Sequence, residues 1–195
     1  MEIIDIQIQG PFNLGMNVSE NLLLNPIGKE KGIYLWTIPF ENKYLVHYVG
    51  ETGVSFAYRT MEHIKNYLQG QYTLYEPEEF AKGKKIQLWS GMWKERKSNP
   101  AVMHEFLQKY PEFSTKYFDF LTLLRFFAIP VESSRRVRQR IESAIARHLY
   151  KQPGIVGAFQ DKGVRYLPRR SDEIPMLLKI KSSVRIISMP IELAI

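Results

Sequence analysis

Two short runs with strand character, residues 33–38 and 44–49, lie close together in the sequence, and a helical pattern follows them directly. Both runs are rich in β-branched and aromatic side chains, and the turn-forming residues Pro39 and Asn42 stand between them. The segment therefore predicts a β-hairpin followed by a helix. This combination of local elements constrains the fold class more than any other feature of the chain.

The register of this hairpin decides where its tyrosines, Tyr34 and Tyr48, lie. If they pair with each other, the turn covers residues 39–43, and alternation places one set of side chains on a single face. That set is Tyr34, Trp36, Ile38, Tyr44, Val46 and Tyr48. A shift of one residue would place the two tyrosines on opposite faces, and the sequence is compatible with both registers.

Two segments have the spacing of amphipathic helices. The first begins after Ser55, a favourable N-cap residue, and extends to about Leu68. The residues expected to face the core from it are Ala57, Met61, Ile64 and Leu68. The second covers residues 133–150, with an apolar residue at every fourth position: Val137, Ile141, Ile145 and Leu149.

The remaining segments mix the periods of strand and helix. The further predicted elements are a strand at 3–9, a strand at 85–89, a helix at 100–109, one or two strands at 117–129, a hairpin at 158–167 and a strand at 176–188. Strands and helices joined by local hairpins predict an α+β fold. The length of 195 residues predicts one domain, residues 1–195.

Basic residues are concentrated in two segments of the chain. There are 27 Lys and Arg against 20 Asp and Glu, a net charge of +7, and the excess falls at residues 82–97 and 135–151. Such clusters attract polyanions, because neutralised phosphates release their counterions. A solvated basic surface is the alternative explanation.

Several classes of protein are disfavoured by what the sequence lacks. It has no cysteine, which excludes disulfides and thiolate metal sites. No apolar run approaches the roughly eighteen residues that span a bilayer. The acidic, alternating N-terminus is unlike a signal peptide. We therefore expect a cytoplasmic protein that does not act with a membrane.

A set of residues spread over the hairpin and the two helices carries a resemblance. Gly32-Ile33-Tyr34 opens the hairpin, Tyr48-Val49-Gly50 closes it, Arg59 follows nine residues later, and Glu142 stands on the second helix. This ordered set resembles the GIY-YIG nuclease family of repair, homing and restriction endonucleases. The resemblance implies a small β-sheet flanked by helices, at about 30–69 and 133–170, with an insert at about 70–132.

The resemblance also implies a role for each residue in hydrolysis of a phosphodiester. Tyr34 matches the tyrosine that orients or deprotonates the attacking water, and Tyr48 matches its partner tyrosine. Arg59 would bind the scissile phosphate and lower the pKa of Tyr34. His63 resembles a histidine of the restriction enzymes and would relay the proton of Tyr34. Glu142 matches the single metal-binding carboxylate, which suits Mg²⁺ or Mn²⁺ with a shell completed by water and substrate.

The insert is expected to recognise DNA, because basic and aromatic residues suit phosphate contact and base stacking. The predicted DNA-binding residues are Lys82, Lys84, Lys85, Trp89, Trp93, Lys94, Arg96 and Lys97, together with Arg138 on the second helix. The size and the single domain favour a restriction-type enzyme that cuts double-stranded DNA. Cutting both strands favours a homodimer.

One departure from the family pattern supports a different function. Family members usually carry an asparagine after the glutamate helix, whereas this chain offers Gln152 and Gln160. If neither glutamine substitutes, the alternative is a catalytically inactive nucleic-acid-binding domain with a GIY-YIG-like fold. Taken singly, a hairpin tyrosine more often packs than reacts, and Glu142 could simply pair with Arg138. The motifs are also compatible with RNA.

Overall fold

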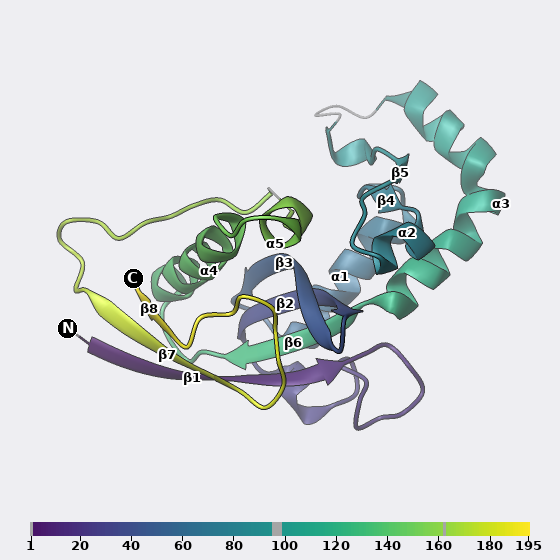
Figure 1. The fold of residues 1–195 in the computed structure, drawn as a ribbon. Coiled ribbons are helices and arrows are strands. Elements are labelled where there is room, and N and C mark those ends of the chain that lie inside the picture. The colour runs from purple at the N-terminus through teal and green to yellow at the C-terminus, as the bar shows by residue number, and fades with distance from the viewer. Residues whose placement is uncertain (1, 95–98, 162) are drawn as a thin grey trace.

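The computed structural model describes residues 2–94, 99–161 and 163–195, and it confirms the predicted α+β class. Six strands form one sheet in the order β3-β2-β6-β1-β7-β8 (Figure 1). Their bounds are β1 Glu2–Phe12, β2 Gly32–Phe40, β3 Lys43–Thr52, β6 Arg125–Pro130, β7 Met176–Ser182 and β8 Glu192–Ala194. Strand β1 runs antiparallel to β6 and parallel to β7.

The helices and a second, small sheet lie around this central sheet. The helices are α1 Phe56–Leu68, α2 Pro77–Ala81, α3 Pro100–Leu123, α4 Arg135–Tyr150 and α5 Ile155–Phe159, with 3₁₀ turns at Pro26–Lys29 and Met92–Lys94. Strands β4 Leu74–Tyr75 and β5 Gln87–Trp89 form the small sheet. Figure 1 shows α2, α3, β4 and β5 at one end of the central sheet and α4, β7 and β8 toward the other.

The insert shares the hydrophobic core of the rest of the chain. Phe120 of α3 packs on Tyr67 of α1 with ring centroids 5.4 Å apart, and Phe80 of α2 packs on Phe159 at 4.6 Å. Strand β6, within the predicted range of the insert at its C-terminal end, pairs with both β2 and β1 in the centre of the sheet. The insert therefore ends before β6. Within the described residues, no helix is long and apolar enough to cross a membrane.

The hairpin forms as predicted, but its register differs both from direct pairing of Tyr34 with Tyr48 and from a shift of one residue. Tyr34 pairs with Gly50 and Trp36 with Tyr48, and a two-residue turn joins the strands. A bulge follows, because Thr37 pairs with Val46 and leaves His47 as an extra residue. The shift of two residues keeps Tyr34 and Tyr48 on one face.

Because of the bulge, Tyr44 and Val46 of β3 have their side chains on the opposite face of the sheet from the predicted one. Tyr44 pairs with Pro39 and packs on Phe127, which itself pairs with Leu35 of β2. Tyr44 and Val46 therefore lie on the face opposite the two tyrosines, and their predicted placement is wrong. The turn is possible because Glu41 and Asn42 adopt positive φ angles of 47° and 58°.

Both amphipathic helices form, but the buried face of α1 differs from the predicted one. The Ser55 hydroxyl caps α1 and the Ser134 hydroxyl caps α4. The buried residues of α1 are Phe56, Thr60, His63 and Tyr67, whereas Met61 and Leu68 are about 40% exposed. This face of α1 packs against β2, because Trp36 of β2 contacts His63 and Tyr67. On α4, Ile141, Ile145 and Leu149 are buried as predicted, and Val137 packs against the core.

Two other predictions from local pattern are wrong. Helix α3 continues through Pro111 to Leu123, so the strand begins only at Arg125. Phe106 and Phe113, on either side of that proline, both pack on Trp89, and this packing outweighs the local break. The predicted hairpin at 158–167 is also absent: α5 ends at Phe159, and no strand forms among residues 160, 161 and 163–167.

Candidate active site

Tyr34 lies at the centre of a cluster assembled from β2, β3, α1 and α4. Its hydroxyl oxygen is 2.9 Å from His63 Nε2, and Arg59 Nε donates a hydrogen bond to it at 3.4 Å. The ring of Tyr48 lies 6.0 Å from that of Tyr34 and 5.9 Å from that of His63. With Glu142, these five residues are the tyrosine cluster.

Gly50 makes room for the Tyr34 ring, and Gly32 makes room for the backbone around the end of β6. A Cβ atom on Gly50 would lie 2.3 Å from Tyr34 Cζ and 2.4 Å from its hydroxyl oxygen. A Cβ atom on Gly32 would lie 2.1 Å from the carbonyl oxygen of Ile129, and Gly32 has a φ of 152°. The tyrosine of the first strand can therefore lie across the second strand only where the second strand has glycine.

Burial decides the protonation of the cluster. It raises the pKa of Tyr34 to about 12, although Arg59 opposes this, and it also raises the pKa of Tyr48. Burial and the charge of Arg59 lower the pKa of His63 to about 3. Both phenols are therefore protonated at neutral pH and His63 is neutral. In its Nδ1–H tautomer, His63 accepts a hydrogen bond at Nε2 from the Tyr34 hydroxyl.

Glu142 is the member of the tyrosine cluster that α4 contributes. Its Oε1 accepts a hydrogen bond from the backbone N–H of Glu51 at 2.9 Å. Burial raises the pKa of Glu142 to about 7, the Glu51 N–H and Arg59 lower it, and the Glu51 carboxylate raises it further. The negative charge of Glu142 in turn helps to raise the pKa values of Tyr34 and Tyr48. The structure thus brings together the five residues that the sequence singled out.

Arg138 has a different place from the predicted one. It is 5% exposed, and its Nε is 3.3 Å from Glu51 Oε2 while Nη1 donates to the carbonyl of Ser133. Within the described residues it forms no ion pair with Glu142. Arg138 joins α4 to β3 next to the Glu51 N–H that binds Glu142. Because its side chain is buried and bonded there, its predicted contact with DNA is wrong.

A cavity of about 450 Å³ opens beside the tyrosine cluster. Tyr48, Arg59 and His63 form one side of it, and Tyr72 and Trp93 of the insert form another. We call it the aromatic cavity. Its lining also includes Asp161, which lies within the segment 158–167 that was predicted to form a hairpin. Only the packing of the segment after α5 against β3 brings Asp161 here, through a hydrogen bond from its backbone N–H to the His47 carbonyl.

The two tryptophans predicted to contact DNA differ in accessibility. Trp93 is 74% exposed at the rim of the aromatic cavity, as a stacking residue requires. Trp89 is 4% exposed, packs against α3 and donates its indole N–H to the carbonyl of Gly70 at 2.7 Å. Trp89 is therefore a core residue, and its predicted role in stacking on DNA is corrected.

The predicted basic residues of the insert are partly neutralised. Lys82 and Lys84 lie 2.7 and 3.3 Å from the two carboxylate oxygens of Glu79. Lys85 donates to the carbonyl of Gln160 at 2.9 Å. Arg96, Lys97 and the side chain of Lys94 lie outside the part of the chain that the structure describes.

Neither glutamine after the glutamate helix reaches the aromatic cavity. Gln160 is 4% exposed and donates from Nε2 to the carbonyl of Val46 at 2.6 Å. Gln152 bonds to His148 at the end of α4. The family's asparagine therefore has no glutamine counterpart at the cluster, and Asp161 is the polar residue of this segment that lines the cavity.

The residues of the cluster fit a hard divalent cation. Among the described residues no group of three or more His, Asp or Glu side chains could hold a metal ion. A lone carboxylate suits Mg²⁺ or Mn²⁺, which retain water and bind substrate oxygens. Glu142 uses Oε1 for the Glu51 N–H, and its other oxygen has no partner among the described residues.

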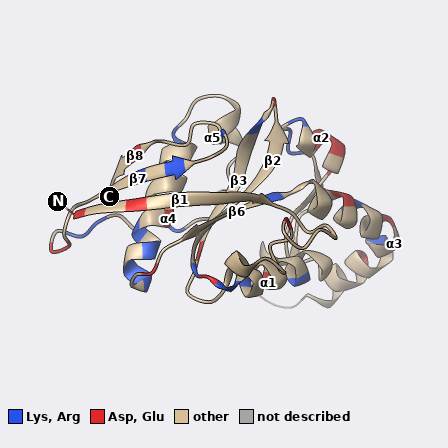
Figure 2. Cartoon of the chain, turned by 90° about the horizontal axis from the view of Figure 1, so that it is seen from below, with Lys and Arg blue, Asp and Glu red and all other residues tan. Residues whose placement is uncertain are grey.

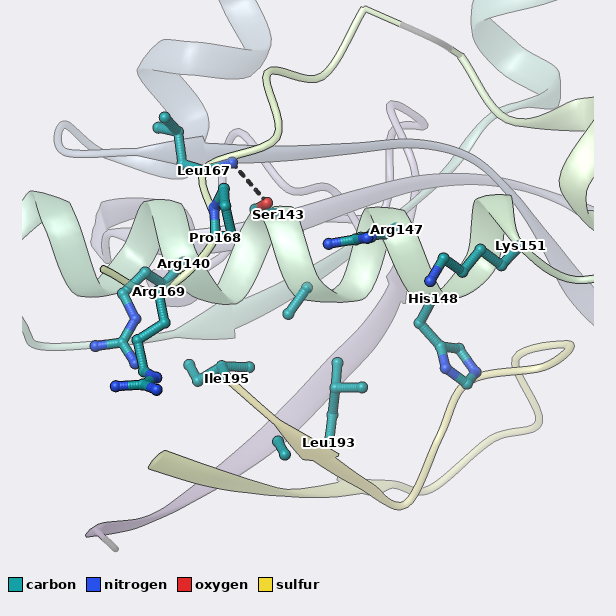
Figure 3. A pocket seen from close by; sticks show the side chains of 12 residues that line it. Arg140, Ser143, Arg147, His148, Lys151, Leu167, Pro168, Arg169, Leu193 and Ile195 are labelled. Carbon is teal, nitrogen blue, oxygen red and sulfur yellow. Dashed lines mark hydrogen bonds between the residues drawn. The ribbon is translucent and has the colours of Figure 1, made fainter. Parts of the chain in front are cut away.

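A second hollow, of about 460 Å³, lies along another face of α4, between the helix, residues 167–169 and the end of β8 (Figure 3). We call it the basic hollow. Its basic lining residues are Arg140, Arg147, His148, Lys151 and Arg169. Lys and Arg are likewise prominent on α4 in Figure 2. The side chains of Arg147 and Lys151 have no hydrogen bond or ion pair to any residue that the structure describes.

The role of Gly50 leads to a first prediction. Gly50→Ala is expected to displace the Tyr34 phenol from His63, to lower the free energy of unfolding by about 1–3 kcal/mol through overpacking, and to remove activity. Thermal denaturation and cleavage assays measure the two effects. Gly15→Ala is the control, because Gly15 is exposed and its Cβ would meet only the side chain of Asn13, at 3.1 Å. Wild-type stability and activity in Gly50→Ala would contradict the placement of Tyr34.

Comparison of the chain with models of protein families, with curated proteins and with solved structures finds no match. The ordered motif and the geometry of the tyrosine cluster are therefore the grounds on which a function is assigned.

Proposed function

We propose that this protein is a metal-dependent endonuclease of the GIY-YIG type that hydrolyses DNA phosphodiester bonds. The observation that carries the proposal is the position of the Tyr34 hydroxyl, between Arg59 Nε and His63 Nε2 and near enough to Glu142 for that carboxylate to help raise its pKa. These residues come from distant parts of the chain. Each has the chemical type that the reaction requires at that place.

The attacking water would be activated through Tyr34 and His63. Water donates a hydrogen bond to the Tyr34 oxygen, and as it loses that proton the hydroxyl proton of Tyr34 passes to His63 Nε2. Burial is the largest cause of the lowered pKa of His63, and the charge of Arg59 lowers it further. A phosphate bound to Arg59 would offset the second effect and so favour transfer of the proton to His63.

Arg59 is suited to hold the scissile phosphate. It donates Nε to Tyr34 and Nη1 to Glu62, while Nη2 has no partner among the described residues and can bind a phosphoryl oxygen. Glu142 would hold the Mg²⁺ or Mn²⁺ ion, which when bound stabilises charge on the phosphoryl and leaving oxygens. Tyr48, whose ring lies 6.0 Å from that of Tyr34, would help to orient the water or the phosphate.

We further propose that the substrate is double-stranded DNA and that the enzyme is of the restriction type, acting as a homodimer so that both strands are cut. The alternative is a nucleic-acid-binding domain without catalysis. One observation favours it: neither Gln152 nor Gln160, the two candidates to replace the family's asparagine, lines the aromatic cavity. Cleavage of plasmid DNA with Mg²⁺, compared with excess EDTA, distinguishes the two functions.

A second prediction locates the DNA-binding surface. Replacing Lys82 and Lys84 by glutamine is expected to weaken DNA binding and to reduce the slope of log K against log salt by about 1.8, or about 0.9 for each phosphate that is no longer neutralised. Both side chains are more than half exposed, so the fold should tolerate the change. Fluorescence anisotropy over a range of salt concentrations measures the slope.

The matched variant changes Arg147 and Lys151 of the basic hollow to glutamine. It removes the same charge from another face of the molecule, and its slope is expected to equal that of the wild type. A reduced slope in this variant and a wild-type slope in the insert variant would place the DNA along α4 and remove the insert from the interface.

A further inference from the structure

The aromatic cavity has the size and lining of a pocket for a planar ring. Its volume of about 450 Å³ lies in the range of small-molecule sites. Tyr72 and Tyr75 of the insert contribute to its wall, and Trp93 stands exposed at its rim. Such aromatic faces stack on nucleobases with little dependence on sequence.

The charges that line the cavity also differ from those of a channel for a phosphate backbone. Arg59 lies on the side of the tyrosine cluster, and Asp161 is the carboxylate of the lining. Asp161 Oδ1 accepts a hydrogen bond from the Gly163 N–H at 3.0 Å, and Oδ2 has no partner among the described residues. A carboxylate repels phosphate, but it accepts hydrogen bonds from the amino groups of cytosine, adenine and guanine.

Two polar side chains that line the cavity have no hydrogen-bond partner among the described residues. Trp36 lines it, is 2% exposed and has an indole N–H without an acceptor among the described residues. The half-buried side chain of Gln71 lines it as well and is not bonded to any described residue. A buried donor without an acceptor is uncommon, and a polar ligand in the cavity can complete such groups.

We propose that this cavity receives one unstacked nucleobase next to the scissile phosphate, with Trp93 stacking on it, Tyr72 meeting its edge from a ring inclined at 69° to that of Trp93, and Asp161 accepting from its amino group. The inference rests on the proposed nuclease function. A base that remains stacked in a duplex cannot enter a side cavity, so the base at the cut site of the double-stranded substrate must be flipped out, which is easiest where it is mismatched or unpaired. Asp161 makes the site select bases that carry an exocyclic amino group.

The test uses the full chain and a series of labelled duplexes that differ at one position near the cut site. The position is fully paired, mismatched or opposite an abasic site, and both affinity and cleavage rate are measured. The wild type is expected to prefer the unpaired duplexes by about tenfold or more, since a damaged or mismatched base is easier to unstack. Trp93→Ala should lose most of that preference.

Two further variants keep the result interpretable. Phe118→Ala removes another exposed aromatic ring, 68% exposed on α3 and outside the cavity, and should retain the preference. Asp161→Asn keeps an acceptor for the Gly163 N–H but can also donate, so it should reduce discrimination between unpaired cytosine and unpaired thymine by about tenfold. Neither change removes a buried side chain.

The outcomes separate this inference from the function on which it rests. Cleavage of all duplexes at equal rates, with Trp93→Ala and Asp161→Asn unchanged, would overturn the base pocket and leave the nuclease. Binding without cleavage, with the preference lost in Trp93→Ala, would keep the pocket and overturn the nuclease. A protein that binds none of the duplexes overturns both.

Discussion

Replacement of Glu142 by glutamine is expected to reduce DNA cleavage by about a thousandfold, the loss that corresponds to about 4 kcal/mol of transition-state stabilisation. The amide oxygen can still accept the hydrogen bond from the Glu51 N–H, so the fold around the site should be retained. The charge that holds the metal ion is lost, however. Single-turnover cleavage rates with Mg²⁺ measure the effect.

DNA affinity is expected to be unchanged or improved in Glu142→Gln, because a carboxylate repels phosphate. The loss should therefore fall on turnover more than on binding. Glu30→Gln, which changes an exposed carboxylate outside the tyrosine cluster, is the control and should retain activity. Cleavage that survives in Glu142→Gln, or that persists in excess EDTA, would show that the metal site is misplaced. Wild type and variant that bind equally and never cleave would establish the alternative, a binding domain.

Replacement of Tyr34 by phenylalanine is expected to slow the chemical step by about a hundredfold to ten-thousandfold, the range of general acid–base catalysis. The ring stays in place over Gly50, but the oxygen that Arg59 and His63 share is lost. If Tyr34 activates the water, binding should change much less than turnover. Rates measured with saturating enzyme and Mg²⁺ separate the two.

Tyr117→Phe is the matched control for this deletion. The Tyr117 hydroxyl is buried in the core and has no hydrogen-bond partner among the described residues. Removing it should leave activity unchanged and leave the free energy of unfolding equal or slightly higher, since an unsatisfied buried hydroxyl is unfavourable. If Tyr34→Phe and Tyr117→Phe were equally active, the Tyr34 hydroxyl would have no role in catalysis and Tyr34 would serve only in packing.

Local pattern in the sequence was sufficient for several elements of the fold. Alternation predicted the hairpin, and the spacing of apolar residues with a serine N-cap predicted α1 and α4. These features depend on interactions between residues a few positions apart, which the sequence displays directly. The ordered motif likewise selected Tyr34, Tyr48, Arg59 and Glu142, and the likeness to the restriction enzymes selected His63. The structure brings these five residues together.

Other features depended on contacts between distant segments, and only the tertiary structure decided them. The bulge at His47 set the hairpin register, and the aromatic face of β2 selected the buried side of α1. Packing on Trp89 allowed α3 to continue as a helix past Pro111. The ion pair with Glu51 allowed the Arg138 side chain to be buried. Asp161 reached the cavity through the packing of the segment after α5 against β3. Local periodicity shows that a residue can be buried or bonded, but which partner it meets depends on how the whole chain packs.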